Sequence, residues 1–314
     1  MKTLSLAAAA AALLAEPALA APAPSMLQPS SPWIVQSADE SCRVLRSFGT
    51  GGDEVLLSFE QAVPRAPMTM MATGGRLRVP TLKARSAATA DFRPIDLAHF
   101  VADGAATTSS GKDVLIWSSV GFRPSGHVRS APVTRARRGG GGSEAAGIVT
   151  LAVQKARRDE ERGRERAANS VDLQIGRGGA PVRLMTGPMS DPMNRLRVCM
   201  NRQLSTWGLD PKVEQTIVKP PIAQTIPASW LEFDGASRIS LKRDELSPVT
   251  VRLIVDKDGK VSSCKADAPR DGKAFEDALC ANVARRAIII PARAENGQTV
   301  PSYLVTTIRR SGGR

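Results

Sequence analysis

Aromatic side chains, histidines and catalytic motifs are scarce in this chain of 314 residues. With one tyrosine, four tryptophans and seven phenylalanines, its cores must rest mainly on valine, leucine, isoleucine and alanine. Gly-x-Ser-x-Gly, His-Glu-x-x-His and phosphate-loop sequences are missing. An exported hydrolase needs a nucleophile with a base in reach, and neither His99 nor His127 has that setting. The sequence therefore predicts a non-enzymatic protein with no cofactor, and an enzyme in the N-terminal domain is the alternative.

The four cysteines have the wrong spacing for a metal site, because no two of them lie two to four residues apart. In an exported chain, four cysteines suggest two disulfides with three possible connectivities. Cys264 lies on an expected strand, and Cys280 lies on the helix expected to cross it. Their bridge would close a loop of about 16 residues and contribute on the order of 3 kcal/mol, which leaves Cys42–Cys199 as the second bridge. Buried free thiols are the alternative.

The N-terminus has the pattern of a secretory signal. Lys2 precedes a short apolar run, and Ala18-Leu19-Ala20 offers the small-x-small cleavage pattern. We therefore expect residues 1–20 to be a signal peptide cleaved between Ala20 and Ala21. No apolar stretch of eighteen residues occurs, so the mature chain is expected in the periplasm, soluble or associated with the membrane.

The formal net charge of +13 raises the question of nucleic-acid binding. Export and the single tyrosine argue against it, because single-strand binding surfaces combine basic grooves with aromatic platforms. The basic excess, which includes a Gly-rich basic loop at 135–143, is better explained by attraction to an anionic envelope surface, either cell wall or lipid. The sequence thus predicts no nucleic-acid partner.

Composition divides the mature chain into four parts. Residues 21–32, rich in proline, alanine and serine, are expected to be disordered. Residues 33–210 carry short apolar runs between Gly, Pro and Asp, which predict an antiparallel β-rich domain with helices, including a short helix from Phe92 to Val101. Residues 211–225, with several prolines, predict an extended tether. Residues 226–314 form the C-terminal domain.

The C-terminal domain is expected to be a small α+β unit. The run from Val249 to Val255 alternates as a half-buried strand does, and Asp258-Gly259 indicates a hairpin turn into a second strand ending at Cys264. Phe275, Leu279 and Val283 form one stripe of a helix over residues 273–286. A last strand, 302–308, completes a three-stranded antiparallel sheet covered by one helix.

This order carries a family resemblance. The Asp-Gly turn, the strand with Cys264 and the helix with Cys280 are followed by Ile290-Pro-Ala292, Asn296-Gly297 and Val300-Pro301. From about Ile226 onward, the chain resembles the TonB C-terminal domain, in the disulfide-bearing form of some envelope proteins. The resemblance implies a role linked to TonB-type energy transduction in transmembrane transport, with capture of receptor peptides by strand addition.

The last strand is the candidate partner-binding segment. It follows a Pro-bounded loop and is expected at a sheet edge, where unpaired backbone groups can accept a guest strand. The partner would be an outer-membrane TonB-dependent receptor or another envelope protein. Coverage of the strand by the tether or by a second copy is the alternative, and a structural envelope protein on an anionic surface is the alternative function. The candidate residues are Ser302, Tyr303, Leu304, Val305, Thr306, Thr307 and Ile308.

Overall fold

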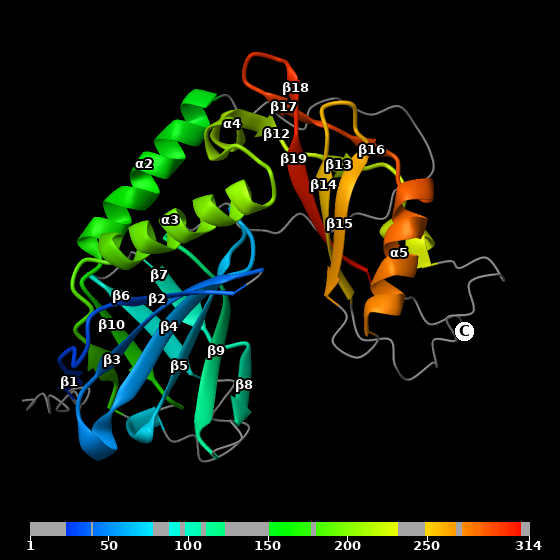
Figure 1. Cartoon of the computed structure of the whole chain (residues 1–314). Coiled ribbons are helices and arrows are strands. Elements are labelled where there is room, and N and C mark those ends of the chain that lie inside the picture. Colours follow the sequence, from blue (N-terminus) through cyan, green and yellow to red (C-terminus); the bar gives the residue numbers. More distant parts are fainter. Residues whose placement is uncertain are drawn as a thin grey trace, which may run out of the picture.

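The protein is an α+β molecule with two main hydrophobic cores, one in each domain. The computed structural model describes residues 23–38, 40–77, 88–94, 98–107, 111–122, 151–176, 180–231, 249–267 and 272–308 (Figure 1). The predicted signal peptide, its cleavage site at Ala20 and Ala21, and the predicted basic loop at 135–143 lie outside these residues.

The larger sheet of the N-terminal domain has six strands in the order β2-β3-β4-β5-β9-β8, and all neighbours are antiparallel. Along β3, Cys42, Val44 and Phe48 are buried on one face, as the two-residue period of a strand requires. The elements are β2 (Ile34–Ser37), β3 (Cys42–Phe48), η1 (Gly51–Asp53), β4 (Val55–Gln61), β5 (Met68–Gly74), η2 (Gly75–Leu77), β8 (Gly104–Thr107) and β9 (Asp113–Val120).

A second sheet of five strands, in the order β1-β11-β10-β6-β7, packs against the first. Strand β1 runs parallel to β11, and the other neighbours are antiparallel. Phe59 of the first sheet lies 6.2 Å from Phe92 of the second, between ring centroids, within one shared core. The strands are β1 (Ser25–Leu27), β6 (Thr89–Arg93), β7 (Ala98–Val101), β10 (Ser170–Gln174) and β11 (Val182–Leu184).

Two helices, α2 (Leu151–Ala167) and α3 (Ser190–Thr206), complete this domain. The predicted disulfide Cys42–Cys199 is confirmed, and it joins β3 to α3. Helix α3 ends where Gly208 takes a φ of +77°, a conformation that glycine adopts without steric cost. The bridge fixes the strand to the middle of α3.

Two predictions for the N-terminal domain are wrong. The segment predicted to be disordered contributes strand β1, whose Leu27 is buried in the core. The predicted helix from Phe92 to Val101 is replaced by parts of β6 and β7. Phe92 is buried between the two sheets, so pairing with distant strands overrides the local helical pattern.

The predicted extended tether at 211–225 is also wrong. Asp210 accepts a hydrogen bond from the Lys212 amide at 2.8 Å, and Pro211 opens helix α4 (Pro211–Thr216). Strands β12 (Ile217–Lys219) and β13 (Ile222–Ala223) then pair with β17 (Ala292–Ala294) and β16 (Ile289–Ile290) of the C-terminal domain. The segment is therefore built into the second domain.

The predicted three-stranded antiparallel sheet with one helix is present in the C-terminal domain, in the order β15-β14-β19. Helix α5 (Gly272–Arg286) and the 3-10 turn η3 (Pro227–Leu231) cover one face, with Trp230 and Phe275 in the core. The strands are β14 (Val249–Val255), β15 (Val261–Asp267), β16 (Ile289–Ile290), β17 (Ala292–Ala294), β18 (Thr299–Val300) and β19 (Ser302–Ile308).

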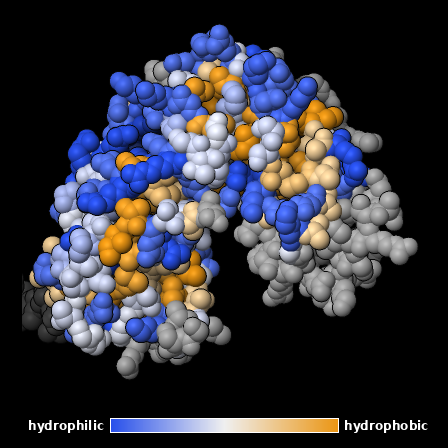
Figure 2. Space-filling model, in the orientation of Figure 1, coloured by the Kyte–Doolittle hydropathy of each residue, from blue (hydrophilic) through white to orange (hydrophobic). Residues whose placement is uncertain are grey.

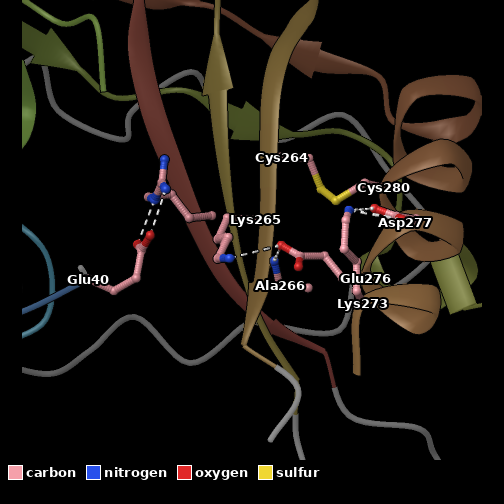
Figure 3. A network of polar contacts seen from close by, with 9 residues as sticks. Glu40, Cys264, Lys265, Ala266, Lys273, Glu276, Asp277 and Cys280 are labelled. Carbon is pink, nitrogen blue, oxygen red and sulfur yellow. Dashed lines mark hydrogen bonds and ion pairs between the residues drawn. A yellow bond between two sulfur atoms is a disulfide. The ribbon is translucent and has the colours of Figure 1, made fainter. Parts of the chain in front are cut away.

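Helix α5 is joined to β15 by covalent and polar contacts (Figure 3). The predicted disulfide Cys264–Cys280 is confirmed, with the Cα atoms 5.6 Å apart. The carboxylate of Glu276 accepts a hydrogen bond from the Ala266 amide at 3.2 Å and lies 3.5 Å from the ammonium of Lys265. The disulfide and these bonds hold helix and sheet as one unit.

Candidate functional site

Strand β19 lies at an edge of the C-terminal sheet. It pairs with β14 over its whole length, from Ser302 opposite Val255 to Ile308 opposite Val249, and with no other strand of the described chain. Successive N–H and C=O groups of an edge strand point alternately toward its neighbour and away from it. Half of the backbone groups of β19 are therefore directed away from β14.

The two faces of β19 have different surroundings. Ile308 is buried in the core under α5, and Leu304 packs against that core. Tyr303 lies on the opposite face, where it packs with Ile254 of β14 against Leu204 at the end of α3. The second face of the sheet thus meets the N-terminal domain.

Arg252 is the central polar contact of this domain junction. Its guanidinium donates two hydrogen bonds of 2.8 Å to the carboxylate of Glu40, which lies in the turn between β2 and β3. The same guanidinium lies 4.2 Å from the centroid of the Trp207 ring. Trp207 in turn packs edge-on against Tyr303, with 5.7 Å between the ring centroids.

A second set of contacts holds the first two residues of β19. Ser302 is fully buried, and its hydroxyl donates a 2.6 Å hydrogen bond to the carboxylate of Glu214 in α4. Arg65 forms an ion pair with that carboxylate, and the hydroxyl of Tyr303 donates to the carbonyl of Pro64. The β4–β5 connection, α4 and β19 therefore meet at one point.

Burial governs the titration of this cluster. It raises the pKa of Glu214 above its ordinary value, although the charge of Arg65 and the hydrogen bond from Ser302 act in the opposite direction. Burial likewise raises the pKa of Tyr303. Glu214 is 4% exposed, so its charge depends on these two neighbours for stabilisation.

The free edge of β19 faces the space between the domains. Figure 1 shows β19 as the strand of its sheet nearest to the N-terminal domain. Figure 2 shows a notch in the molecular surface between the two domains, below the junction. A strand added to β19 would lie in this notch, between the two lobes of the molecule.

The predicted partner-binding segment is thus divided into two parts. The side chain of Tyr303 binds the N-terminal domain, and that of Ser302 binds Glu214, which pairs with Arg65 of that domain. Both residues therefore belong to the junction. Val305, Thr306 and Thr307 keep partly or fully exposed side chains. The stretch from Leu304 to Ile308 is therefore the part of the edge that could accept a guest strand.

Residues considered for other chemistry lie elsewhere. His99 is exposed on β7, in contrast to its expected place in a short helix, and its Nδ1 atom lies beside the carboxylate of Asp91. His127 is outside the described residues. Across the described ranges, no cluster of three His, Cys, Asp or Glu side chains could hold a metal ion. No helix of that part of the chain is both long enough and apolar enough to cross a membrane.

The residues of the junction were not found by sequence reasoning. Arg252 alternates with apolar residues on a strand, and Trp207 ends a helix, so both patterns only indicated secondary structure. Glu40 and Glu214 do not belong to any of the motifs described in the sequence. Asp210-Pro211 was a usable sign that a helix, and thus Glu214, follows α3 directly.

No family model, curated protein or solved structure matches this chain. Its function has to be inferred from the geometry of its own residues.

Proposed function

We propose that this chain is a non-enzymatic periplasmic binding protein that captures an extended segment of an envelope protein on the free edge of β19. The observation that carries the proposal is that, within the part of the chain that the structure describes, β19 pairs with a strand on one side only. The resemblance of residues 226–314 to the TonB C-terminal domain favours the periplasmic segment of an outer-membrane receptor as the guest. Such a function would belong to TonB-type energy transduction and transport.

The construction of the sheet supports this function. A guest strand gains affinity from main-chain hydrogen bonds and gains specificity from side chains that point alternately up and down. Strand addition also needs an edge that is held in place before binding, because ordering it afterwards would reduce affinity. Here the pairing with β14 and the contacts of Ser302 and Tyr303 hold β19 along its length.

The two disulfides support the proposed compartment. Disulfides persist in oxidising surroundings such as the bacterial periplasm and are rare in the cytosol. Within the described residues, all four cysteines are paired. The Cys264–Cys280 bridge also stabilises the small sheet that carries the edge.

Amide hydrogen exchange tests the proposal directly. The probe is a synthetic peptide with the extended periplasmic segment of a TonB-dependent receptor, added to the mature chain. Alternate amides between Leu304 and Ile308 should exchange more slowly, because those that point away from β14 would donate to the guest strand. The amides of β15, at the opposite edge, are the internal control.

A pair of proline variants adds a second test. Because successive N–H groups point to opposite sides, one of Val305→Pro and Thr306→Pro disrupts the ladder to β14, and the other removes a donor from the free edge. The variant that keeps its thermal stability should bind the peptide about tenfold more weakly, as loss of one or two hydrogen bonds implies. Unchanged exchange at β19, or protection at β15 instead, contradicts the proposal.

A further inference from the structure

Three exposed isoleucines lie on one face of the β13–β16 ribbon, and a fourth follows β13 in the chain. Ile222 and Ile290 are directly opposite each other, and the Gln224 amide donates to the carbonyl of Ile288 two residues along. The two-residue period of strands therefore places Ile288 on the same face. Ile226 lies four residues after Ile222, beyond a bend at 224–225. Their exposed fractions are 55% for Ile222, 74% for Ile226, 59% for Ile288 and 41% for Ile290.

This arrangement differs from scattered surface apolar residues, which are normal in soluble proteins. A contiguous apolar patch marks a contact site for another molecule. Figure 2 shows hydrophobic side chains at the surface over the part of the C-terminal domain where β13 and β16 lie.

A cationic pair lies in the adjoining β12–β17 sheet, three residues from Ile222 and Ile290 along the two chain segments. Lys219 of β12 is paired across the strands with Arg293 of β17, and both side chains are exposed. Like charges directly opposite each other destabilise a sheet, so this pair costs stability in the free protein. Among the described residues, neither cation has an ion-pair partner.

We propose that this ribbon is a docking surface for a bilayer that contains anionic phospholipid. The isoleucines would enter the boundary between headgroups and acyl chains, and Lys219 and Arg293 would bind the lipid phosphates. A bilayer uses both halves of the surface at once, because it presents apolar chains beneath a layer of negative charge. A soluble polyanion would engage the cations alone and leave the isoleucines in water.

This inference is independent of the peptide-binding edge. One strand of the ribbon, β13, follows β12 in the chain, and the other, β16, follows α5 and precedes β17. Strand β19 lies on the side of the sheet next to the N-terminal domain (Figure 1). The chain could therefore contact a bilayer with the ribbon while the edge of β19 stays accessible.

Co-sedimentation of the mature chain with vesicles tests the proposal. The vesicles contain phosphatidylglycerol with phosphatidylcholine, or phosphatidylcholine alone. We expect binding to the anionic vesicles that weakens as salt is raised. The double variant Ile222→Thr/Ile290→Thr keeps strand propensity and should lower the partition coefficient about tenfold, because two ethyl-sized apolar groups are lost. The double variant Lys219→Gln/Arg293→Gln should lower it by about tenfold or more.

Matched controls change equally exposed residues elsewhere. Ile34→Thr/Val35→Thr removes two exposed apolar side chains from β2, and Arg202→Gln/Lys260→Gln removes two exposed charges. Both controls should bind as the unaltered chain does, and thermal unfolding confirms that all variants are folded. Equal binding by ribbon variants and controls overturns the proposal. So does equal binding to neutral vesicles, or loss of binding in the charge variant alone, which would indicate a site for polyanions only.

Discussion

The guanidinium of Arg252 lies over the ring of Trp207, 4.2 Å from its centroid, while its Nε and Nη2 atoms donate the two hydrogen bonds to Glu40. One side chain of the C-terminal sheet thereby contacts the end of α3 and the β2–β3 turn together. The planar guanidinium can stack and bind a carboxylate at once, which an ammonium cannot do. The relative position of the two domains depends on this contact.

Removal of the Arg252–Glu40 pair should loosen the domain junction. Arg252 is 11% exposed and Glu40 is 39% exposed, so solvent weakens the pair only in part. We expect a coupling free energy of about 1–2 kcal/mol from a double-mutant cycle of Arg252→Gln and Glu40→Gln. Arg252→Gln should also increase the radius of gyration in X-ray scattering. Arg43→Gln, which breaks an ion pair with Glu60 inside the N-terminal domain, should leave that radius unchanged.

The Cys264–Cys280 bridge should stabilise the C-terminal domain selectively. The bridge spans 16 residues of sequence, so its loss in Cys264→Ser/Cys280→Ser should cost about 3 kcal/mol. Exchange of the β14 amides should accelerate by a corresponding factor, while exchange of the β4 amides stays the same. Equal acceleration in both sheets would show that the domains unfold as one unit.

The turn between β14 and β15 requires glycine for two reasons. Gly259 has a φ of +84°, and an added Cβ would lie 2.3 Å from the carbonyl oxygen of Ile289 in β16. Gly259→Ala should therefore lower the free energy of unfolding by about 2–4 kcal/mol, since strain and a backbone clash add. Gly297→Ala is the matched control, because Gly297 has a similar φ of +81° but no atom near the added Cβ. Denaturant unfolding should show a loss of only about 1 kcal/mol for the control.

Glu214 should make the junction more stable in acid. Its folded pKa is raised from the ordinary value of 4.5, so its stabilising contribution is present below that value. The contribution is lost as the pH rises through the folded pKa. The free energy of unfolding of the natural chain, minus that of Glu214→Gln, should therefore be larger below about pH 4 than at neutral pH.

Asp172 provides the contrast for this pH measurement. Burial favours its neutral form, but the bonds from Arg183 and Arg93 together hold the pKa of Asp172 below its ordinary value. The free energy of unfolding of the natural chain, minus that of Asp172→Asn, should have the opposite pH dependence. This contribution to stability should be lost as the pH falls through the lowered pKa of Asp172. If the stability difference changed with pH in the same direction for Glu214→Gln and Asp172→Asn, the causes assigned to the two pKa shifts would be wrong.

Local patterns predicted the C-terminal domain well. The alternation in 249–255, the Asp258-Gly259 turn and the apolar stripe of α5 each predict one element, and the packing of these elements brings Cys264 and Cys280 together. Contacts over short sequence distances decide this part of the fold. The resemblance to the TonB C-terminal domain and the peptide-binding role stay predictions.

Long-range pairing explains what the sequence did not reveal. Strand β6 pairs with β10, about eighty residues later in the chain, and β7 pairs with β6. Their helix-like local pattern was therefore misleading. The prolines of 211–225 predict an extended tether, but Pro211 follows an N-capping Asp210 and opens a helix instead. The junction around Arg252 and Trp207 depends on how two domains meet, and no local pattern encodes that.

The β13–β16 ribbon could be predicted only in part from the sequence. The run Ile288-Ile289-Ile290 was visible before Pro291, but it gave no indication of its partner strand. Pairing with β13 buries Ile289 and leaves its two neighbours exposed. Which isoleucines reach the surface follows from that register.

Helix α3 connects the two domains. Its middle is bonded through Cys199 to β3, and about two turns later it presents Trp207 to the other domain. A reducing environment that opened the Cys42–Cys199 bridge would remove the covalent bond between α3 and β3. The tilt of the distant sheet, and with it the width of the notch beside β19, would then respond to the redox state of the surroundings.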